Sequence, residues 1–242
     1  MDSLFAGMHE FTEPHFWVAV VEIIWINVLL SGDNAIVIAL ACRNLPPKQR
    51  LGGMIIGTAV ALLLRLIFAG VVSSLMLFPY IKIAGGIALL WIAVRLLVSD
   101  HPQDNANIHA NDSLWRAVRL IALADVVMSL DNVIAVAGAA AGNQALLIFG
   151  LGISVPAIVA GSTVIMALLN YFPLLIWAGA ALLGWIAGDM IATDPVVAAK
   201  TGTLSGSEQD KFRLASSVFG VSATIGGGLL LRGRALRAKE EI

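Results

Sequence analysis

The amino-acid sequence predicts an all-α membrane protein with seven transmembrane helices, arranged as two inverted three-helix repeats plus one C-terminal helix. The first indication is composition: 59% of the 242 residues are hydrophobic and 13% are charged, whereas soluble domains carry about 25% charged residues. The second is a series of long runs that are nearly free of charge. The third is the pattern Ser-x-Asp-Asn, which occurs once in each half of the chain.

The apolar runs predict the helices in order. Each is close to the roughly 20 residues that a helix needs to cross a bilayer. The runs lack the alternation of barrel strands and are too long for them, so the spanning backbone must be helical. The acidic N-terminus does not resemble a signal peptide, and we expect the first run to be retained. The runs are Phe16–Ala41, Leu51–Leu77, Pro79–Val98, Leu114–Ala141, Ala145–Leu169, Tyr171–Ala192 and Phe212–Leu231.

Basic residues predict the orientation, because they concentrate in the cytoplasmic loops of membrane proteins. They flank the first and third loops and fill the tail after the last run, which places the N-terminus outside and the C-terminus inside. The formal net charge of -1 gives no reason to expect a nucleic-acid partner, and the lipid bilayer is the expected environment. The residues concerned are Arg43, Lys48, Arg50, Arg95, Arg116, Arg119, Arg232, Arg234, Arg237 and Lys239.

The two halves align as copies of one unit. An offset of 98 residues (131 minus 33) aligns Asp33 with Asp131 and Asn27 with Asp125. Each copy has three runs, and three is an odd number, so the second copy must enter the membrane from the opposite side. The expected organisation is a first repeat over 1–99, a cytoplasmic polar loop over 100–113, a second inverted repeat over 114–193, and a region over 194–242 that holds an external linker, the seventh helix and a basic tail.

The repeated polar residues predict an ion site. An aspartate at the centre of a transmembrane helix costs roughly 2.5 to 3.5 kcal/mol, so two in matching positions indicate binding of an ion or a proton. Inverted repeats typically hold their site near the midplane, between interrupted helices. Oxygen ligands favour Mg²⁺, Ca²⁺ or Mn²⁺ over softer metals. The candidate ligands are Asp33, Asn34, Asp131, Asn132, Asp125 and Asn27, with Glu22 as a proton-carrying or entry-path carboxylate.

Several features keep more than one interpretation. Arg65 could hold an aspartate's charge when the site is empty, or it could form a purely structural ion pair. For positions 27 and 33 to reach one ion, the first helix would have to open near Gly32, and Leu130 stands at that place in the second copy. The loop with His101 and His109 could collect metal or could be an ordinary polar loop. The Gly53/Gly57 and Gly184/Gly188 pairs are interpreted as helix-packing faces.

The motifs resemble those of the TerC family of integral membrane proteins, in its YjbE-type branch. The resemblance rests on Ser31–Leu40 (SGDNAIVIAL), Ser129–Ala135 (SLDNVIA) and the layout of seven runs. It implies a multi-pass protein of the bacterial inner membrane that exports manganese and protects against metal stress, including tellurite. Carried over to this chain, it places the site at Asp33, Asn34, Asp131 and Asn132, with Asp125, Glu22 and Arg65 as further candidates.

Energetics narrow the expected mechanism. Expelling a divalent cation against 100 mV costs about 4.6 kcal/mol, and the chain has no G-x-x-x-x-G-K-[ST] motif for using ATP. Export would therefore require cation/proton exchange. Two alternatives remain: a membrane scaffold that delivers Mn²⁺ to secreted proteins together with a secretion-machinery partner, and an exporter of a small organic solute. No run places a nucleophile beside a base, so we expect no enzyme. The sequence does not indicate an oligomeric state.

Overall fold

The helices of the protein follow the apolar runs closely. The computed structural model describes residues 17–18, 20–24, 31–69, 79–98, 110–139, 144–202 and 206–240, and an all-helical fold is confirmed for these residues. Residues 20–24 are also helical and precede the helix that begins at Gly32. The elements are α3 (Gly32–Cys42), α4 (Pro47–Ala69), α6 (Ile81–Val98), α7 (Ala110–Ala139), α8 (Gln144–Tyr171), α9 (Leu174–Ala192), α10 (Pro195–Thr201) and α11 (Gly206–Glu240).

Five of these helices are long and apolar enough to cross a membrane, by length and composition. They lie within α4, α6, α8, α9 and α11, and α3 is apolar but has only 11 residues. Large apolar side chains such as Ile67 and Phe219 are exposed on the outer surface, as expected where helices face lipid. The chain is therefore a multi-pass helical membrane protein, and the full count of seven spans stays a prediction.

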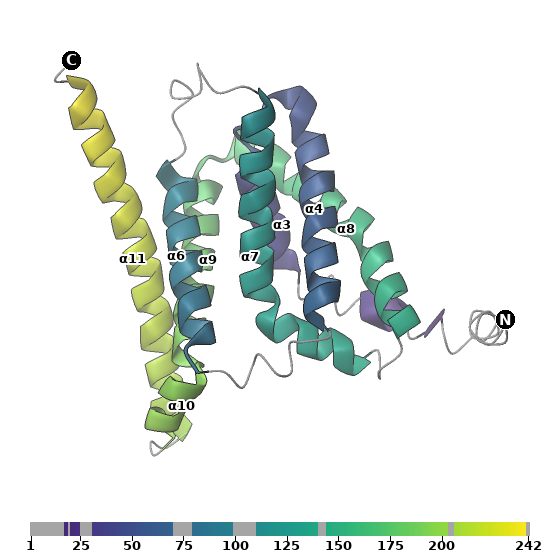
Figure 1. Ribbon diagram of the computed structural model, residues 1–242. Coiled ribbons are helices and arrows are strands. Elements are labelled where there is room, and N and C mark those ends of the chain that lie inside the picture. Colours follow the sequence, from purple (N-terminus) through teal and green to yellow (C-terminus); the bar gives the residue numbers. More distant parts are fainter. Residues whose placement is uncertain are drawn as a thin grey trace.

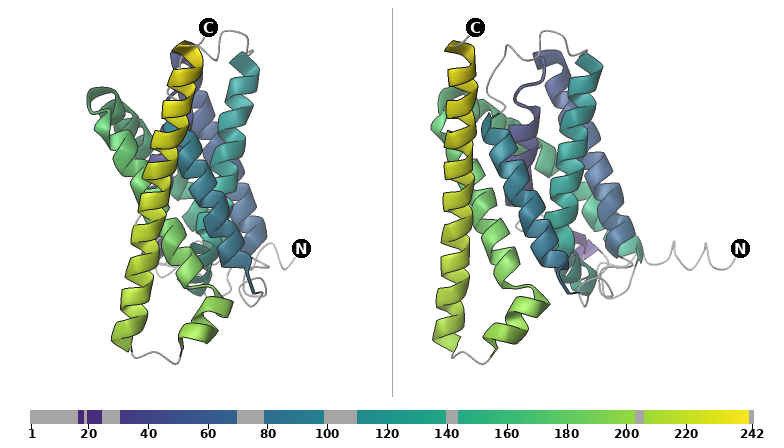
Figure 2. Two further views of the ribbon diagram at one scale, coloured as in Figure 1. Left: turned by 90° about the vertical axis from the view of Figure 1, so that its left-hand side faces the viewer. Right: turned by 60° about the vertical axis from the view of Figure 1, so that its left-hand side comes forward.

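The helices pack in two connected groups. α6, α9 and α11 pack against one another, while α4 packs against α7 and α3 against α8. Figure 1 shows α11 at one edge of the bundle beside α6 and α9, with α7, α3, α4 and α8 beyond them. Figure 2 shows α11 running along the whole length of the bundle, with the short α10 near its beginning. α3 and α7 meet in the second group, and this contact brings together the helices that carry the two Ser-x-Asp-Asn motifs.

The glycine pairs are confirmed as packing positions. A Cβ atom added at Gly184 would lie 2.6 Å from the carbonyl oxygen of Gly220, so α9 and α11 approach each other backbone to backbone. In the other group, a Cβ at Gly57 would lie 2.5 Å from Cδ1 of Ile121 on α7. Small residues let helices in a membrane approach this closely, and the resulting van der Waals contact helps to hold them together.

The described structure differs from the sequence predictions at the linker. The region over 194–242 was expected to hold an external linker before its helix, but most of the residues before α11 form the short helix α10. The reason is local: Asp194 caps α10 by accepting a hydrogen bond from the N–H of Val196, and Pro195 follows at the first helical position. Both are strong helix-start signals. α11 also continues past Leu231, where the last apolar run ends, to Glu240.

Candidate functional site

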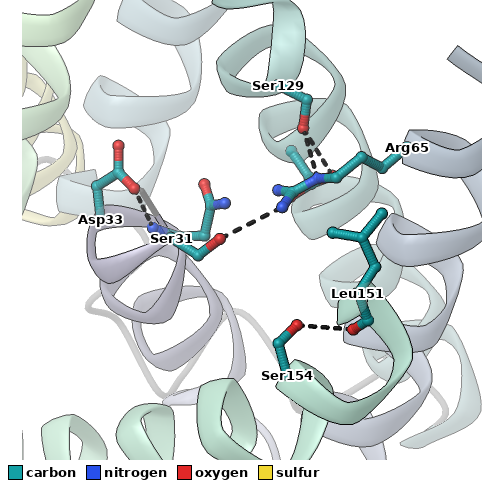
Figure 3. Close-up of polar contacts among 8 residues, drawn as sticks. Ser31, Asp33, Arg65, Ser129, Leu151 and Ser154 are labelled. Carbon is teal, nitrogen blue, oxygen red and sulfur yellow. Dashed lines mark hydrogen bonds and ion pairs between the residues drawn. The ribbon is translucent and has the colours of Figure 1, made fainter. Parts of the chain in front are cut away.

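Arg65 of α4 lies at the centre of a buried polar cluster between the two halves of the chain. Its side chain is only 5% exposed. Nη2 lies 2.5 Å from Oδ1 of Asp125, Nε donates to Oγ of Ser129 at 3.1 Å, and Nη1 donates to Oγ of Ser31 at 3.3 Å. Figure 3 shows the guanidinium between Ser31 and Ser129. Arg65 thus forms an ion pair with Asp125, and this contact is compatible with both interpretations of the arginine.

Each Ser-x-Asp-Asn motif contributes its serine to this cluster. Ser31 immediately precedes α3, where it occupies the N-cap position, and Ser129 lies in α7. The offset of 98 residues that aligns Asp33 with Asp131 also aligns Ser31 with Ser129 (129 minus 31). The two motifs therefore meet at one guanidinium through the first residue of each.

Asp125 and Ser129 form a unit on one face of α7. They are four residues apart, which places them one above the other on a helix. Ser129 donates to Oδ2 of Asp125 at 3.1 Å, while Arg65 occupies Oδ1. Both carboxylate oxygens are thus engaged, and the guanidinium balances the charge of the carboxylate. A buried charge is tolerated in an apolar bundle when it is paired in this way.

A small cavity lies beside this pair, between α3, α4, α7 and α8. Its volume is about 20 Å³, which exceeds the roughly 10 to 15 Å³ needed to hold one water. Asn34, Thr58 and Ser154 line it together with Arg65 and Asp125, and the other lining side chains are apolar. Thr58 and Ser154 donate to carbonyl oxygens of their own helices; Figure 3 shows the bond from Ser154 to Leu151.

Asn34 is the exceptional group in the cavity wall. It is 4% exposed, and neither Oδ1 nor Nδ2 of its side chain has a hydrogen-bond partner among the described residues. Leaving a buried polar group unsatisfied costs about 1 to 3 kcal/mol. Such a group in a cavity wall calls for a ligand or for a function that justifies its cost.

Two helices that line the cavity, α3 and α8, carry a helix beginning and an internal proline. α3 begins at Gly32, close to where the first helix was predicted to open, and residues 25–30 lie outside the described part of the chain. α8 contains Pro156 two residues after Ser154, and a proline inside a helix removes one backbone hydrogen bond. α7, in contrast, continues as helix through Leu130, so the two copies differ at this point.

The other predicted ligands do not join the described cluster. Asp33 is partly exposed and accepts a hydrogen bond from the N–H of Asn34 at 2.8 Å. Figure 3 shows it on the far side of Ser31 from Arg65. Glu22 is exposed and does not line the cavity. Asn27, the side chains of Asp131 and Asn132, and the loop with His101 and His109 lie outside the described residues.

Sequence reasoning missed the hydroxyl groups of the site. Ser31 and Ser129 were noticed as part of the motif but were not proposed as site residues, and Thr58 and Ser154 were not considered. The repetition of serine at the first motif position was the available signal. Within the described part of the chain, no three His, Cys, Asp or Glu residues gather as a metal cluster. A cation in this cavity would therefore meet mainly amide and hydroxyl oxygens with one carboxylate.

Comparisons with known proteins agree with the membrane fold. The family described as "Integral membrane protein TerC family" matches residues 12–235. The chain is 44% identical over 182 residues to "Uncharacterized membrane protein YjbE" of Bacillus subtilis, covering 75% of this chain and 83% of that protein. It is 30% identical over 188 residues to "Uncharacterized membrane protein YceF" of the same organism, covering 74% and 72%.

A more distant similarity extends to larger proteins. "UPF0053 inner membrane protein YoaE" of Escherichia coli K12 is 31% identical over 146 residues, which cover 52% of this chain and 28% of that protein. No solved structure matches the chain.

Proposed function

The chain belongs to the TerC family of integral membrane proteins, and we propose that it is a secondary transporter that exports a hard divalent cation, most readily Mn²⁺, in exchange for protons. The observation that carries the proposal is the unpartnered amide of Asn34 in the wall of the cavity beside Asp125. An amide oxygen, a carboxylate and hydroxyl oxygens are the ligands that Mg²⁺ and Mn²⁺ accept. We propose transport and no enzymatic reaction.

The size of the cavity favours a single ion over an organic solute. A volume of about 20 Å³ accommodates one water or one ion, whereas pockets for organic ligands typically measure about 300 to 1,000 Å³. Mg²⁺ and similar small cations usually keep several waters and use only one or two carboxylates from the protein. A site with one carboxylate suits such weak, partly hydrated binding, which a transporter needs in order to release its ion.

The packing of the helices supports a repeat whose two copies are related by a two-fold axis, and the odd number of runs in each copy makes the repeat inverted. If the two copies are related by a two-fold axis, α3, α4 and α6 correspond to α7, α8 and α9. Such an axis requires each contact to have an equivalent one. The contact between α3 and α8 should be matched by a contact between α7 and α4, and the contact between α3 and α9 by one between α7 and α6. All four contacts are present. This pattern favours the arrangement in which alternating access exposes a central site to each side in turn.

The topology that we propose has seven spans, with the N-terminus outside and the C-terminus inside a bacterial inner membrane. In addition to the five spanning helices, it counts α7 and the first apolar segment that ends in α3. The distribution of basic residues supports this orientation. Cysteines introduced into a Cys42→Ala background at each terminus should react with an impermeant maleimide from opposite sides; labelling of both from one side would refute the odd count.

The proton part of the mechanism is assigned to a carboxylate outside the Arg65 cluster. Asp125 is already balanced by a guanidinium, which stays protonated at all physiological pH values. Asp33 and Asp131, the aspartates of the two motifs, are the candidates for carrying a proton when the metal has left. Exchange with protons would supply the roughly 4.6 kcal/mol that export of a divalent ion requires at 100 mV.

Manganese flux in proteoliposomes tests the function. The native protein should move Mn²⁺ against its concentration gradient when a proton gradient is imposed, and reversing the proton gradient should reverse the flux. Asp33→Asn and Asp131→Asn should each abolish the coupled movement. Binding of Mn²⁺ without any flux would refute transport and favour a membrane scaffold that delivers the metal to secreted proteins.

A further inference from the structure

We propose that Arg65 is an internal competitor of the transported cation: its guanidinium occupies Asp125 while the site is empty and leaves it when the metal ion binds. This inference rests on the proposed function and names how the binding site is regulated. It makes Arg65 the residue that determines the affinity of the site. The geometry of three groups carries it: the carboxylate of Asp125, the guanidinium of Arg65 and the amide of Asn34.

Both carboxylate oxygens of Asp125 are engaged by groups of the protein. Arg65 holds Oδ1 and Ser129 donates to Oδ2. A divalent ion that enters the adjacent cavity meets a carboxylate whose charge is already compensated, and it also meets the positive charge of the guanidinium. Like charges repel strongly in a poorly hydrated interior. The ion can therefore take Asp125 only if the guanidinium moves away.

The side-chain amide of Asn34 lies near the guanidinium but forms no hydrogen bond with it. Asn34 and Arg65 line the same cavity, yet neither polar atom of the Asn34 side chain is bonded. A permanent structural pair would be expected to satisfy the buried polar groups around it, as most native sites do. An open amide beside a paired carboxylate is the arrangement expected of a site that awaits a second cation.

A second ion pair in the same chain, half-exposed on the surface, has a different geometry. Nε and Nη2 of Arg213 both donate hydrogen bonds to the carboxylate of Asp189, at 2.9 to 3.1 Å. Such bidentate pairs are the strongest and most directional. The described contacts of Arg65 include a single nitrogen on the carboxylate, and two neutral serine hydroxyls accept from the other nitrogens at 3.1 and 3.3 Å. Bonds to hydroxyls are weaker than bonds to a carboxylate.

Replacement of the metal ion by the Arg65 guanidinium at Asp125 affects how the site returns after release of the ion. The guanidinium cannot lose its proton, so it neutralises Asp125 by position alone. The empty site can then reorient without a proton on Asp125. Arg65 also lowers the affinity for the metal, which helps the ion to leave, because an ion that binds too tightly would not be released.

Binding of Mn²⁺ to the purified protein in detergent tests the inference separately from transport. The signal of free Mn²⁺ in electron paramagnetic resonance reports the bound fraction. We expect Arg65→Gln to bind Mn²⁺ at least about tenfold more tightly, in line with the coupling between close charges. Arg65→Lys, which keeps the positive charge, should stay near the native affinity. Arg213→Gln is the matched control and should not change it.

A second variant keeps the test decisive if Arg65→Gln does not fold. Ser31→Ala removes one hydroxyl that holds the guanidinium and leaves the Asp125 carboxylate in place. If Arg65 competes with the metal, this loosening should tighten Mn²⁺ binding by about two- to fivefold. Weaker or unchanged binding in the folded variants would overturn the inference. If the native protein binds and transports Mn²⁺ but these variants do not bind it more tightly, the inference alone fails; if no variant binds Mn²⁺, the proposed function fails as well.

Discussion

Ser31 and Ser129 accept hydrogen bonds from the same guanidinium, that of Arg65. They are the first residues of the two Ser-x-Asp-Asn motifs, and the repeat alignment makes them equivalent. The arginine has no counterpart in the second copy, since residues 159–163, which align with it, contain no basic residue. One arginine thus serves both motifs. Both motifs contribute a serine to the cluster, but only the first half of the chain contributes an arginine.

The ion pair between Arg65 and Asp125 should couple strongly in stability. Asp125→Asn leaves a buried guanidinium without its carboxylate, and we expect it to lower the free energy of unfolding by about 3 to 5 kcal/mol. Arg65→Gln/Asp125→Asn removes both charges and should recover most of the loss. Chemical unfolding in detergent measures the cycle. Asp189→Asn, in a half-exposed pair, is the control and should cost about 0 to 1 kcal/mol; additive effects at Arg65 and Asp125 would contradict the account.

Asn34→Leu should make the protein more stable. The native amide is buried without hydrogen bonds, and replacing such a group by an apolar one of similar size removes a penalty of about 1 to 3 kcal/mol. The apparent unfolding temperature in detergent should rise. Thr224→Val is the matched variant, because Oγ1 of Thr224 is also buried and unpartnered but lies between α9 and α11, away from the cavity. A drop in stability for Asn34→Leu would show that the amide is bonded in the native protein.

Asp194 joins the two halves of the chain near one end of the bundle. Its buried carboxylate caps α10 and also accepts hydrogen bonds from the N–H groups of Tyr80, which precedes α6, and of Ile83 in the first turn of α6. Asp194→Ala leaves these donors unsatisfied, and we expect a loss of about 1 to 3 kcal/mol in unfolding free energy. Asp210→Ala, at an exposed position of α11, should have a much smaller effect. Equal effects would mean that the double cap contributes nothing.

Gly184→Ala should loosen the packing of α9 against α11. The added methyl group would lie 2.6 Å from the carbonyl oxygen of Gly220, and the backbone on both sides leaves it no room. Overpacking of this kind typically costs about 1 to 3 kcal/mol. Gly226→Ala, in open space on α11, should be neutral or slightly stabilising, because alanine favours a helix more than glycine does. The apparent unfolding temperatures of Gly184→Ala and Gly226→Ala in detergent, each compared with that of the native protein, test this prediction.

The fold was largely predictable because hydrophobicity alone determines where spanning helices lie. The runs Pro79–Val98 and Tyr171–Ala192 correspond to α6 and α9 within a few residues at each end. α10 and the early start of α11 were not predicted, although the Asp194-Pro195 pair is a recognisable helix start. The repeat was visible in sequence because identical residues recur at a fixed offset, which needs no knowledge of packing.

The site was predictable only in part. Sequence reasoning identified Asn34, Asp125 and Arg65, since polar residues in apolar runs stand out. It expected Asp33 to join them, but Asp33 points elsewhere. The rotation of α3 about its own axis, and its beginning at Gly32, decide which motif residue faces the cavity. These depend on contacts with α7 and α8 that come from distant parts of the chain, and no local pattern reports them.

Manganese flux through Asn34→Leu and Thr224→Val, reconstituted side by side in proteoliposomes, tests most directly whether the ion passes through the cavity beside Asn34. Both variants should be at least as stable as the native protein, so unfolding would not explain a loss of Mn²⁺ flux. We expect Asn34→Leu to lose at least about nine-tenths of the proton-driven Mn²⁺ flux, corresponding to about 1.4 kcal/mol or more, and Thr224→Val to retain it. Native flux in a folded Asn34→Leu variant would contradict the assignment of this cavity as the ion site.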